Sequence, residues 1–244
     1  MRISWEQLSQ NIESCQACAL AAGCLNKVPG QGDPHAPLML IGEGPGRQED
    51  QEGLAFVGPA GQLLTRMLAA ISLPRDRVYI CNVVKCRPPN HRQPKPEEMA
   101  ACLPHLRGQA ALVRPRVILL LGATAVAAVL GPQERITRCR GRWFERKGTH
   151  IIATYHPSAL LRDPSKKMCI RDRNLGKIRG FRNLPHGGFF HKTALLHPVG
   201  RGGSVLGAVG VHATSPCVAL GASPKRRRVY ARGFLSIIAH IAPL

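Results

Sequence analysis

Four cysteines stand in two groups whose spacing suits metal binding. Cys15 and Cys18 form a Cys-x2-Cys pair near the N-terminus, and Cys86 and Cys102 flank a loop that follows an apolar run. Thiolates that converge from two parts of a chain can hold a metal, and on spacing alone four cysteines suit zinc or an iron–sulfur cluster. The chain has nine cysteines and no sign of secretion, so we expect metal ligation rather than disulfides at these four.

A glycine-rich turn with acidic residues follows the first apolar run. The turn Gly42-Glu-Gly-Pro-Gly46 carries Glu43, and Glu49 follows shortly after it. Glycines let a backbone approach a planar or anionic ligand, and free amides at a strand end can bind that ligand. The Gly-Lys-Ser/Thr ending of a phosphate-binding P-loop is missing from the motif. Two simpler interpretations stay open: the turn is structural, and Glu49 caps the helix that follows.

Two more polar side chains stand where apolar runs end. Asn82 and His156 each follow such a run directly. An amide offers a donor and an acceptor together, and an imidazole can donate a hydrogen bond to a developing anion. Apolar side chains can enter the base steps of DNA, and arginine binds phosphate. The segment after His156 supplies both kinds of side chain, in Leu160, Leu161 and Arg162.

All these motifs lie at the ends of predicted strands. Continuous apolar runs predict strands covered on both faces, at residues 38–41, 78–81, 117–121 and 150–155. Helical stretches alternate with them, at residues 60–70, 96–113 and 123–130. The alternation predicts an α/β fold, a three-layer α/β/α sandwich around a central four-stranded parallel sheet, with ligands at the carboxyl ends of the strands. The C-terminal helix that would close such a sandwich is missing from the pattern.

Charge divides the chain in two. Residues 1–166 carry 21 Lys and Arg against 13 Asp and Glu, a net charge of +8, whereas residues 167–244 carry 13 against one, a net charge of +12. We therefore expect a folded domain over residues 1–166 and a basic tail over residues 167–244 that is disordered or artefactual. A secretory signal and an apolar run of about 18 residues are both missing, so we expect a cytoplasmic protein without a membrane span.

Five features, in this order and spacing, resemble the family 4 uracil-DNA glycosylases, the iron–sulfur branch of the uracil glycosylase superfamily. They are the first cysteine pair, the glycine-rich turn with its acids, Gly58-Pro-Ala-Gly-Gln-Leu-Leu64, Asn82-Val-Val-Lys-Cys-Arg-Pro-Pro89 with Cys102, and His156-Pro-Ser158. The resemblance covers about residues 10–166. It implies a base excision repair enzyme that hydrolyses the N-glycosidic bond of deoxyuridine in DNA, releases uracil and leaves an abasic site. It also implies a [4Fe-4S] cluster on Cys15, Cys18, Cys86 and Cys102.

The resemblance further implies roles around the base. Phe56 would stack on uracil, and the Asn82 amide would read its Watson–Crick edge. His156 would donate a hydrogen bond to the oxyanion that develops at O2, and the amides around Gly44 would help to hold the base.

Other residues would handle the sugar and the DNA. Glu49 is the first candidate to position the attacking water or to face the cationic sugar, and Glu43 is the second. One leucine of the segment after His156 would fill the gap left by the flipped base, and basic side chains would contact phosphates. These residues are Leu160 or Leu161 for the gap, and Arg162, Lys85 and Arg87 for the phosphates.

Two other functions stay open. The chain could be a catalytically inactive iron–sulfur protein that binds nucleic acid. It could also trap DNA covalently through His91, which lies in a loop where a related subgroup carries a sugar-capturing histidine. The longer basic insertion that accompanies that histidine is missing here, which favours turnover. The expected partner is uracil-containing DNA, single- or double-stranded, and the expected state is a monomer.

Overall fold

The computed structural model describes residues 3–163 and 165. The predicted tail, residues 167–244, and the predicted lack of a closing helix lie outside the described residues.

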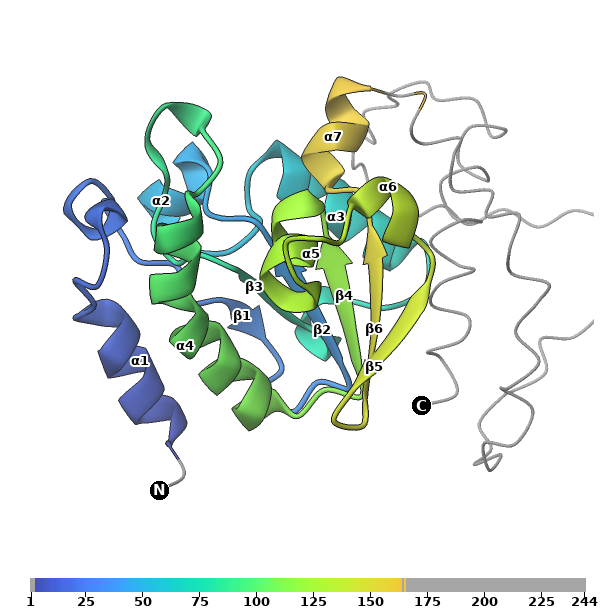
Figure 1. Ribbon diagram of the computed structural model, residues 1–244, viewed down its shortest axis with the longest axis horizontal. Coiled ribbons are helices and arrows are strands. Elements are labelled where there is room, and N and C mark those ends of the chain that lie inside the picture. The colour runs from blue at the N-terminus through green and yellow to red at the C-terminus, as the bar shows by residue number, and fades with distance from the viewer. Residues whose placement is uncertain (1–2, 164, 166–244) are drawn as a thin grey trace, which may run out of the picture.

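A mostly parallel sheet forms the centre of the molecule (Figure 1). Its strand order is β1-β3-β2-β4-β6-β5, in which β3, β2, β4 and β6 run parallel and the two edge strands are antiparallel to their neighbours. The strands are β1 (Gln31–Gly32), β2 (Leu38–Gly42), β3 (Tyr79–Asn82), β4 (Val117–Leu121), β5 (Trp143–Arg146) and β6 (Thr149–Thr154).

The α/β fold and its four parallel strands are confirmed, but the sheet has six strands rather than four. Every residue of β2, β3 and β4 is buried, which is why each reads as a continuous apolar run. The edge strand β5 is half-exposed and ends in Glu145 and Arg146, and β1 is only two residues long. Neither edge strand has the apolar run on which the prediction depended.

Helices cover the sheet on both sides. The three predicted helices are confirmed within one residue as α3 (Pro59–Ala69), α4 (Pro96–Val113) and α5 (Ala123–Leu130). Proline stands at the first position of α3, α4 and α7, where its missing N–H costs no hydrogen bond. The remaining helical elements are α1 (Trp5–Glu13), η1 (Ala19–Ala22), α2 (Arg47–Glu52), η2 (Arg75–Arg77), η3 (Pro89–His91), α6 (Ile136–Cys139) and α7 (Pro157–Arg162).

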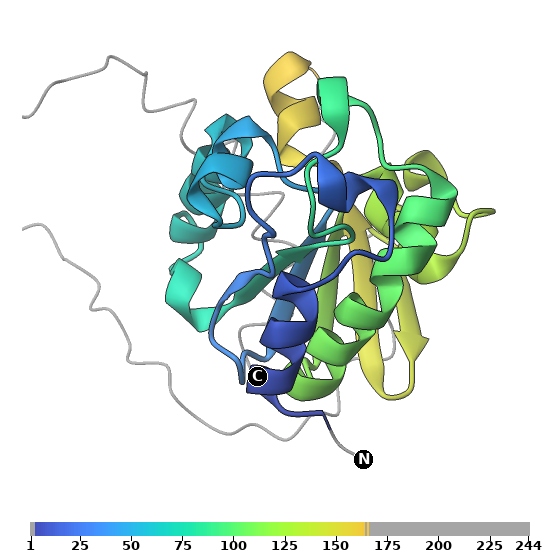
Figure 2. The ribbon, with the colours of Figure 1, turned by 90° about the vertical axis from the view of Figure 1, so that its left-hand side faces the viewer.

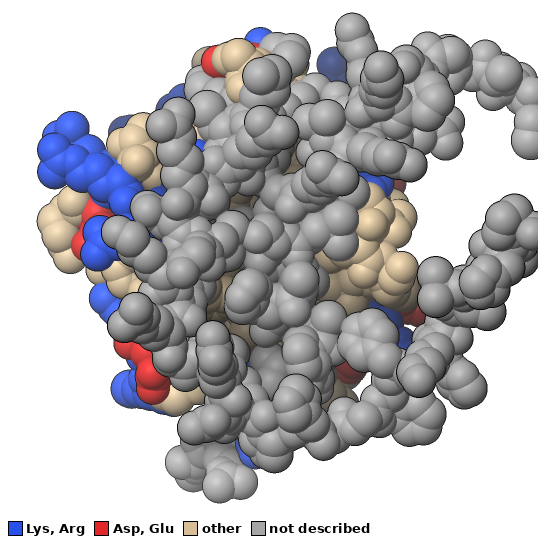
Figure 3. Space-filling view, turned by 90° about the vertical axis from the view of Figure 1, so that its right-hand side faces the viewer, with Lys and Arg blue, Asp and Glu red and all other residues tan. Residues whose placement is uncertain are grey.

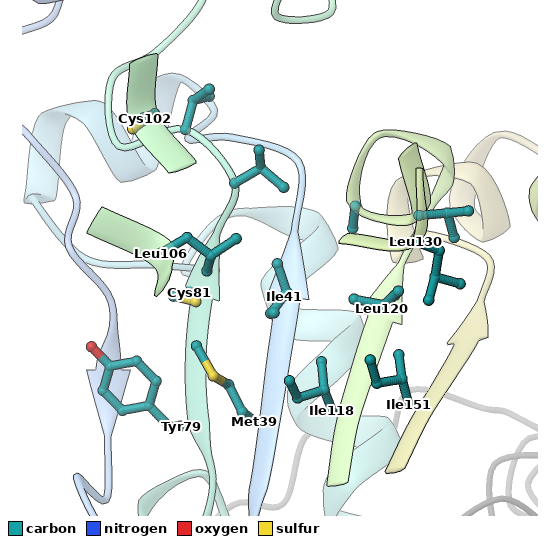
Figure 4. Packing of buried hydrophobic residues seen from close by; sticks show 14 of the residues in the cluster. Met39, Ile41, Tyr79, Cys81, Cys102, Leu106, Ile118, Leu120, Leu130 and Ile151 are labelled. Atoms are coloured by element: carbon teal, nitrogen blue, oxygen red, sulfur yellow. The ribbon is translucent and has the colours of Figure 1, made fainter. Parts of the chain in front are cut away.

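Alternate strand residues feed two apolar layers. Met39 and Ile41 of β2 face α4 and α5 together with the η1 segment, in the layer that Figure 4 shows. Leu38 and Leu40 face α3 and α7 on the other side. Figure 2 shows α1 lying along α4 outside the first layer. Cys102 of α4 belongs to that first layer, so the layer extends to the predicted metal ligands.

The described surface carries charges of both signs. Figure 3 views the molecule from the β5 side, where Lys and Arg side chains are visible close to Asp and Glu side chains. In the described part of the chain, none of the helices is long and apolar enough to cross a membrane.

Candidate active site and cysteine site

A cavity of about 560 Å³ opens at the carboxyl ends of the parallel strands. It is lined by residues from the turn after β2, the end of β3 and the start of α7. Because parallel strands bring their carboxyl ends to one edge of the sheet, segments far apart in the sequence meet there. The predicted site residues on the lining are Glu43, Gly44, Glu49, Phe56, Asn82, His156 and Arg162.

Asn82 presents an unpaired carbonyl oxygen to this cavity. Its side chain is 2% exposed, and within the described residues its Oδ1 atom has no hydrogen-bond partner. A buried polar atom without a partner is costly, and such atoms in folded proteins frequently await a ligand or water. Gly42 makes room for it, because a Cβ atom there would lie 2.5 Å from Oδ1.

His156 is held in one orientation by Ser158. The backbone amide of Ser158 donates to the His156 Nδ1 atom at 3.2 Å, and the Ser158 hydroxyl lies 2.8 Å from the same atom. Since Nδ1 accepts a hydrogen bond, the proton of the neutral ring sits on Nε2. Burial, followed by the charge of Arg162, lowers the pKa of His156 to about 4. The site therefore holds a neutral imidazole whose Nε2–H can donate.

Phe56 stands beside His156 on the cavity wall. The two ring centroids are 5.6 Å apart with an interplanar angle of 31°. Gly42 again allows the approach, since a Cβ atom there would lie 2.4 Å from the Phe56 Cζ atom. The ring is 5% exposed, so a planar ligand in the cavity would meet its face or edge with little water present.

The two glutamates are held differently. The Glu49 carboxylate accepts hydrogen bonds from the amides of Gly46 at 3.1 Å, Val57 at 3.0 Å and Gly58 at 2.8 Å. The bond to Gly46 caps α2, so the capping interpretation of Glu49 describes one of its contacts. Glu43 instead accepts a hydrogen bond from the Thr124 hydroxyl at the start of α5. Both glutamates line the cavity. Glu49 accepts hydrogen bonds from three amides, and Glu43 accepts one from a hydroxyl.

Some of the residues predicted to contact DNA are buried, and others are exposed or line the cavity. Leu160 is 3% exposed in the layer beneath α7, so it cannot fill a gap in DNA, whereas Leu161 is 40% exposed. Lys85 is 2% exposed, so the prediction that it contacts phosphates is wrong. Arg87 lines the cavity and lies 3.8 Å from the Asp50 carboxylate. Arg162 also lines the cavity, next to the exposed Leu161.

The four predicted metal ligands share a second, small pocket. Cys15 and Cys18 come from the segment after α1, Cys86 from the segment after β3, and Cys102 from α4. All four are free thiols, and the backbone amide of Lys85 donates to the Cys102 sulfur at 3.3 Å. Among the described residues, however, no three His, Cys, Asp or Glu side chains are placed to hold a single metal ion. The four cysteines therefore line one pocket without forming a site for a single metal ion.

Buried Lys85 lies between the two sites. Its Nζ atom donates to the main-chain carbonyl oxygen of Asn82 at 2.7 Å and to the Gln109 Oε1 atom at 2.6 Å. Gln109 in turn donates to the Pro29 carbonyl oxygen at 2.7 Å and to the Tyr79 hydroxyl at 3.0 Å. The backbone of Lys85 contacts the cysteine site while its side chain contacts Asn82. One residue therefore connects the two sites.

Several residues that hold the site had no predicted role. Thr124 anchors Glu43, and Ser158 orients His156. Ser158 was visible in the His-Pro-Ser motif, two residues after a helix-capping histidine, but Thr124 stands in an apolar helical stretch and gives no signal. His91, an exposed residue, also lines the cavity.

Comparison with known proteins identifies the family. The model of the uracil DNA glycosylase superfamily matches residues 29–175. A type-4 uracil-DNA glycosylase from Thermotoga maritima is 45% identical over 167 residues, which cover 67% of this chain and 86% of that protein. Type-4 enzymes from Sulfurisphaera tokodaii and Archaeoglobus fulgidus are 40% and 43% identical, over 84% and 85% of their lengths and 72% and 66% of this chain. The chain therefore belongs to the uracil DNA glycosylase superfamily, and within it to the type-4 uracil-DNA glycosylases.

Proposed function

We propose that this chain removes uracil from DNA by hydrolysing the N-glycosidic bond of deoxyuridine, as the names of its relatives state for those proteins. The observation that carries the proposal is that an unpaired Asn82 amide, a neutral His156 and the Phe56 ring all face one cavity. An amide that reads a base, a donor for a leaving anion and an aromatic wall are what excision of a pyrimidine requires.

The base must reach the cavity before it is cleaved. A base inside a duplex is inaccessible to such a pocket, so the nucleotide is flipped out of the stack. Phe56 stacks on the uracil ring, and Asn82 reads its N3–H and O4 edge, with Oδ1 accepting from N3–H. The backbone around Gly44, also on the cavity lining, holds the opposite side of the base.

His156 stabilises the charge that develops as the bond breaks. Heterolysis leaves the electron pair on uracil, and the negative charge is shared with O2. Because Nδ1 is occupied by the Ser158 amide, Nε2–H is the atom that donates to O2. A donor that is already oriented toward the developing charge is effective, and loss of one such donor typically costs about 100-fold in kcat.

The carboxylates serve the sugar and the water. Heterolysis leaves cationic character on the sugar. Water attacks C1′, and one of its protons passes to the Glu43 carboxylate. Glu49, whose carboxylate accepts hydrogen bonds from three amides, faces the cationic sugar. Glu43, fixed at one oxygen by Thr124, orients the attacking water.

Residues at the cavity rim contact the DNA. Leu161 fills the space left by the flipped base, since it is the exposed leucine of α7. Arg162 and Arg87 contact phosphates, which makes binding weaken with salt.

We also propose that Cys15, Cys18, Cys86 and Cys102 hold a [4Fe-4S] cluster. In such a cluster each thiolate binds a different iron atom, and the proposal is supported by the four cysteines, which all line one small pocket. An amide hydrogen bond to a ligating sulfur, like that from Lys85 to Cys102, is a typical supporting contact. When bound, the cluster would join the segments around these cysteines and take no part in the bond cleavage.

A uracil-release assay tests the function. A labelled oligonucleotide with one uracil is incubated with the protein and then treated with alkali, which breaks the strand at abasic sites. We expect breaks with uracil and none with thymine at the same position. His156→Ala should lower kcat by about 100-fold while its cluster absorbance stays unchanged. Intact uracil strands with the wild-type protein would refute the proposal.

The same reactions separate the two alternative functions. An inactive binding protein would retard the uracil strand in a native gel and yield no breaks. A covalent trap would leave a protein–DNA adduct after denaturation, and because His91 lines the cavity, His91→Ala would remove that adduct. We expect turnover, with breaks in excess of the protein and no adduct.

A further inference from the structure

Phe56 has a backbone conformation that its sequence disfavours. Its φ angle is +55°, in the left-handed region that residues with a Cβ atom rarely adopt. Such a conformation persists only when surrounding contacts hold it, and it is commonly found where a site needs a particular side-chain direction. The ring direction at the cavity wall therefore depends on what grips the Phe56 backbone.

Arg75 holds this backbone by hydrogen bonds to its carbonyl oxygens. Its Nη1 atom donates to the Phe56 carbonyl oxygen at 3.1 Å, and its Nη2 atom donates to the Ala55 carbonyl oxygen at 2.9 Å. Nη1 also donates to the Thr65 hydroxyl of α3 at 3.1 Å, which fixes the guanidinium against a helix. A planar guanidinium can reach two neighbouring carbonyls at once, which a lysine ammonium cannot match.

Other contacts hold the same turn from the opposite side. The amides of Val57 and Gly58 donate to Glu49, so the two peptides after Phe56 are fixed as well. The Phe56 carbonyl packs so closely on Gly61 of α3 that a Cβ atom there would lie 1.8 Å from the oxygen. With the carbonyl fixed on this side, the ring projects toward Gly42 and His156.

We propose that Arg75 is a positioning residue that sets the affinity for the flipped base by holding the Phe56 ring in its stacking position. The inference rests on the proposed function of the cavity. Arg75 is not among the residues that line the cavity, and among the described residues its hydrogen bonds go to the Phe56 turn and to Thr65. It acts through Phe56 and not on phosphate or base.

The test compares two arginines of the same short helix. Arg75→Met removes the grip, and Arg77→Met, at an exposed position of η2, removes an equal charge without touching the Phe56 turn. Affinity is measured by titrating labelled uracil-containing and thymine-containing duplexes, with His156→Ala in both proteins and readings taken before the slowed cleavage proceeds. We expect Arg75→Met to weaken uracil-DNA binding about tenfold, the size of a lost base–aromatic stack. Thymine-DNA binding should match that of the Arg77→Met protein.

Two further measurements separate positioning from folding and from charge. In the active background, KM should rise about tenfold while kcat changes less than about threefold, because His156 and Glu43 keep their own contacts. Methylguanidinium added to Arg75→Ala should lower KM again, as it restores the two hydrogen bonds. Equal weakening on both duplexes, an unchanged KM, or loss without rescue would each overturn the proposal. Failure of the wild-type protein to release uracil would refute the function instead, and the binding comparison would still report on Arg75.

Discussion

The cavity and the cysteine site both draw residues from one short segment, residues 82–87, yet they are built differently. In the cavity, catalytic candidates are fixed by the fold itself: Glu49 by three amides and His156 by Ser158. The cysteine site gathers thiols from a loop, a strand end and a helix that pack outside the sheet. We infer that the sheet preorganises the cavity, whereas the proposed cluster, when bound, would join the segments of the cysteine site.

Loss of a cysteine ligand should have the largest effect on stability. Cys86→Ser should remove the visible absorption of the proposed [4Fe-4S] cluster, its brown chromophore. It should also lower the free energy of unfolding by at least about 3 kcal/mol, since structural metals contribute on the order of 10 kcal/mol in small domains. Visible absorption and urea unfolding measure the two effects. Cys139→Ser is the matched control, because Cys139 is a buried free thiol in the same apolar layer as Cys86 and does not line the small pocket. An unchanged chromophore in Cys86→Ser would exclude the four-cysteine assignment.

Acid should act on the cavity through His156. Its folded-state pKa is lowered to about 4 by burial and then by Arg162, against an ordinary value of about 6.5. The unfolded chain therefore takes up the proton first, and the free energy of unfolding should fall by up to about 3 kcal/mol as pH is lowered from about 6.5 to about 4.

Urea unfolding of the wild-type protein and of His156→Gln over this pH range measures that contribution. The cysteine site is the same in both proteins, so its own response to acid cancels in the difference between them. The difference should shrink as the pH approaches 4, because glutamine does not titrate. Two parallel curves would show that His156 is not buried as a neutral ring.

The site residues that could be predicted are those marked by a local sequence pattern, and the others depend on contacts with distant parts of the chain. Asn82 and His156 were predicted to lie close together because each directly follows an apolar run and parallel strands bring such positions together, and both line the cavity. Lys85 was misplaced because its burial depends on Gln109, a helical residue 24 positions later. Leu160 and Leu161 could not be distinguished until the rotation of α7 was known. Arg75 gave no signal, since its partners are backbone carbonyls 19 and 20 residues earlier in the chain.

Lys85→Met should affect both sites, but less than the changes above. Methionine fills a similar volume but leaves the main-chain carbonyl of Asn82 and the Gln109 side chain without their donor. This loss should lower the free energy of unfolding by about 2 kcal/mol. KM for uracil-DNA should rise because the Asn82 backbone is less firmly held, and the chromophore should bleach faster in air. Urea unfolding, initial rates and visible absorption measure the three effects.

Lys27→Met tests whether a nearby positive charge alone explains this result. Lys27 is half-buried and lines the small pocket, as the cysteines do, but it is not a lining residue of the cavity that holds Asn82. If Lys85 connects the sites through its hydrogen bonds, Lys27→Met should change bleaching at most and leave KM unaltered. If both variants raise KM equally, the effect is one of charge on DNA binding, and the two sites are independent. A rise in KM confined to Lys85→Met would show that the cavity, although built on the sheet, still depends on the segment that the cysteines hold.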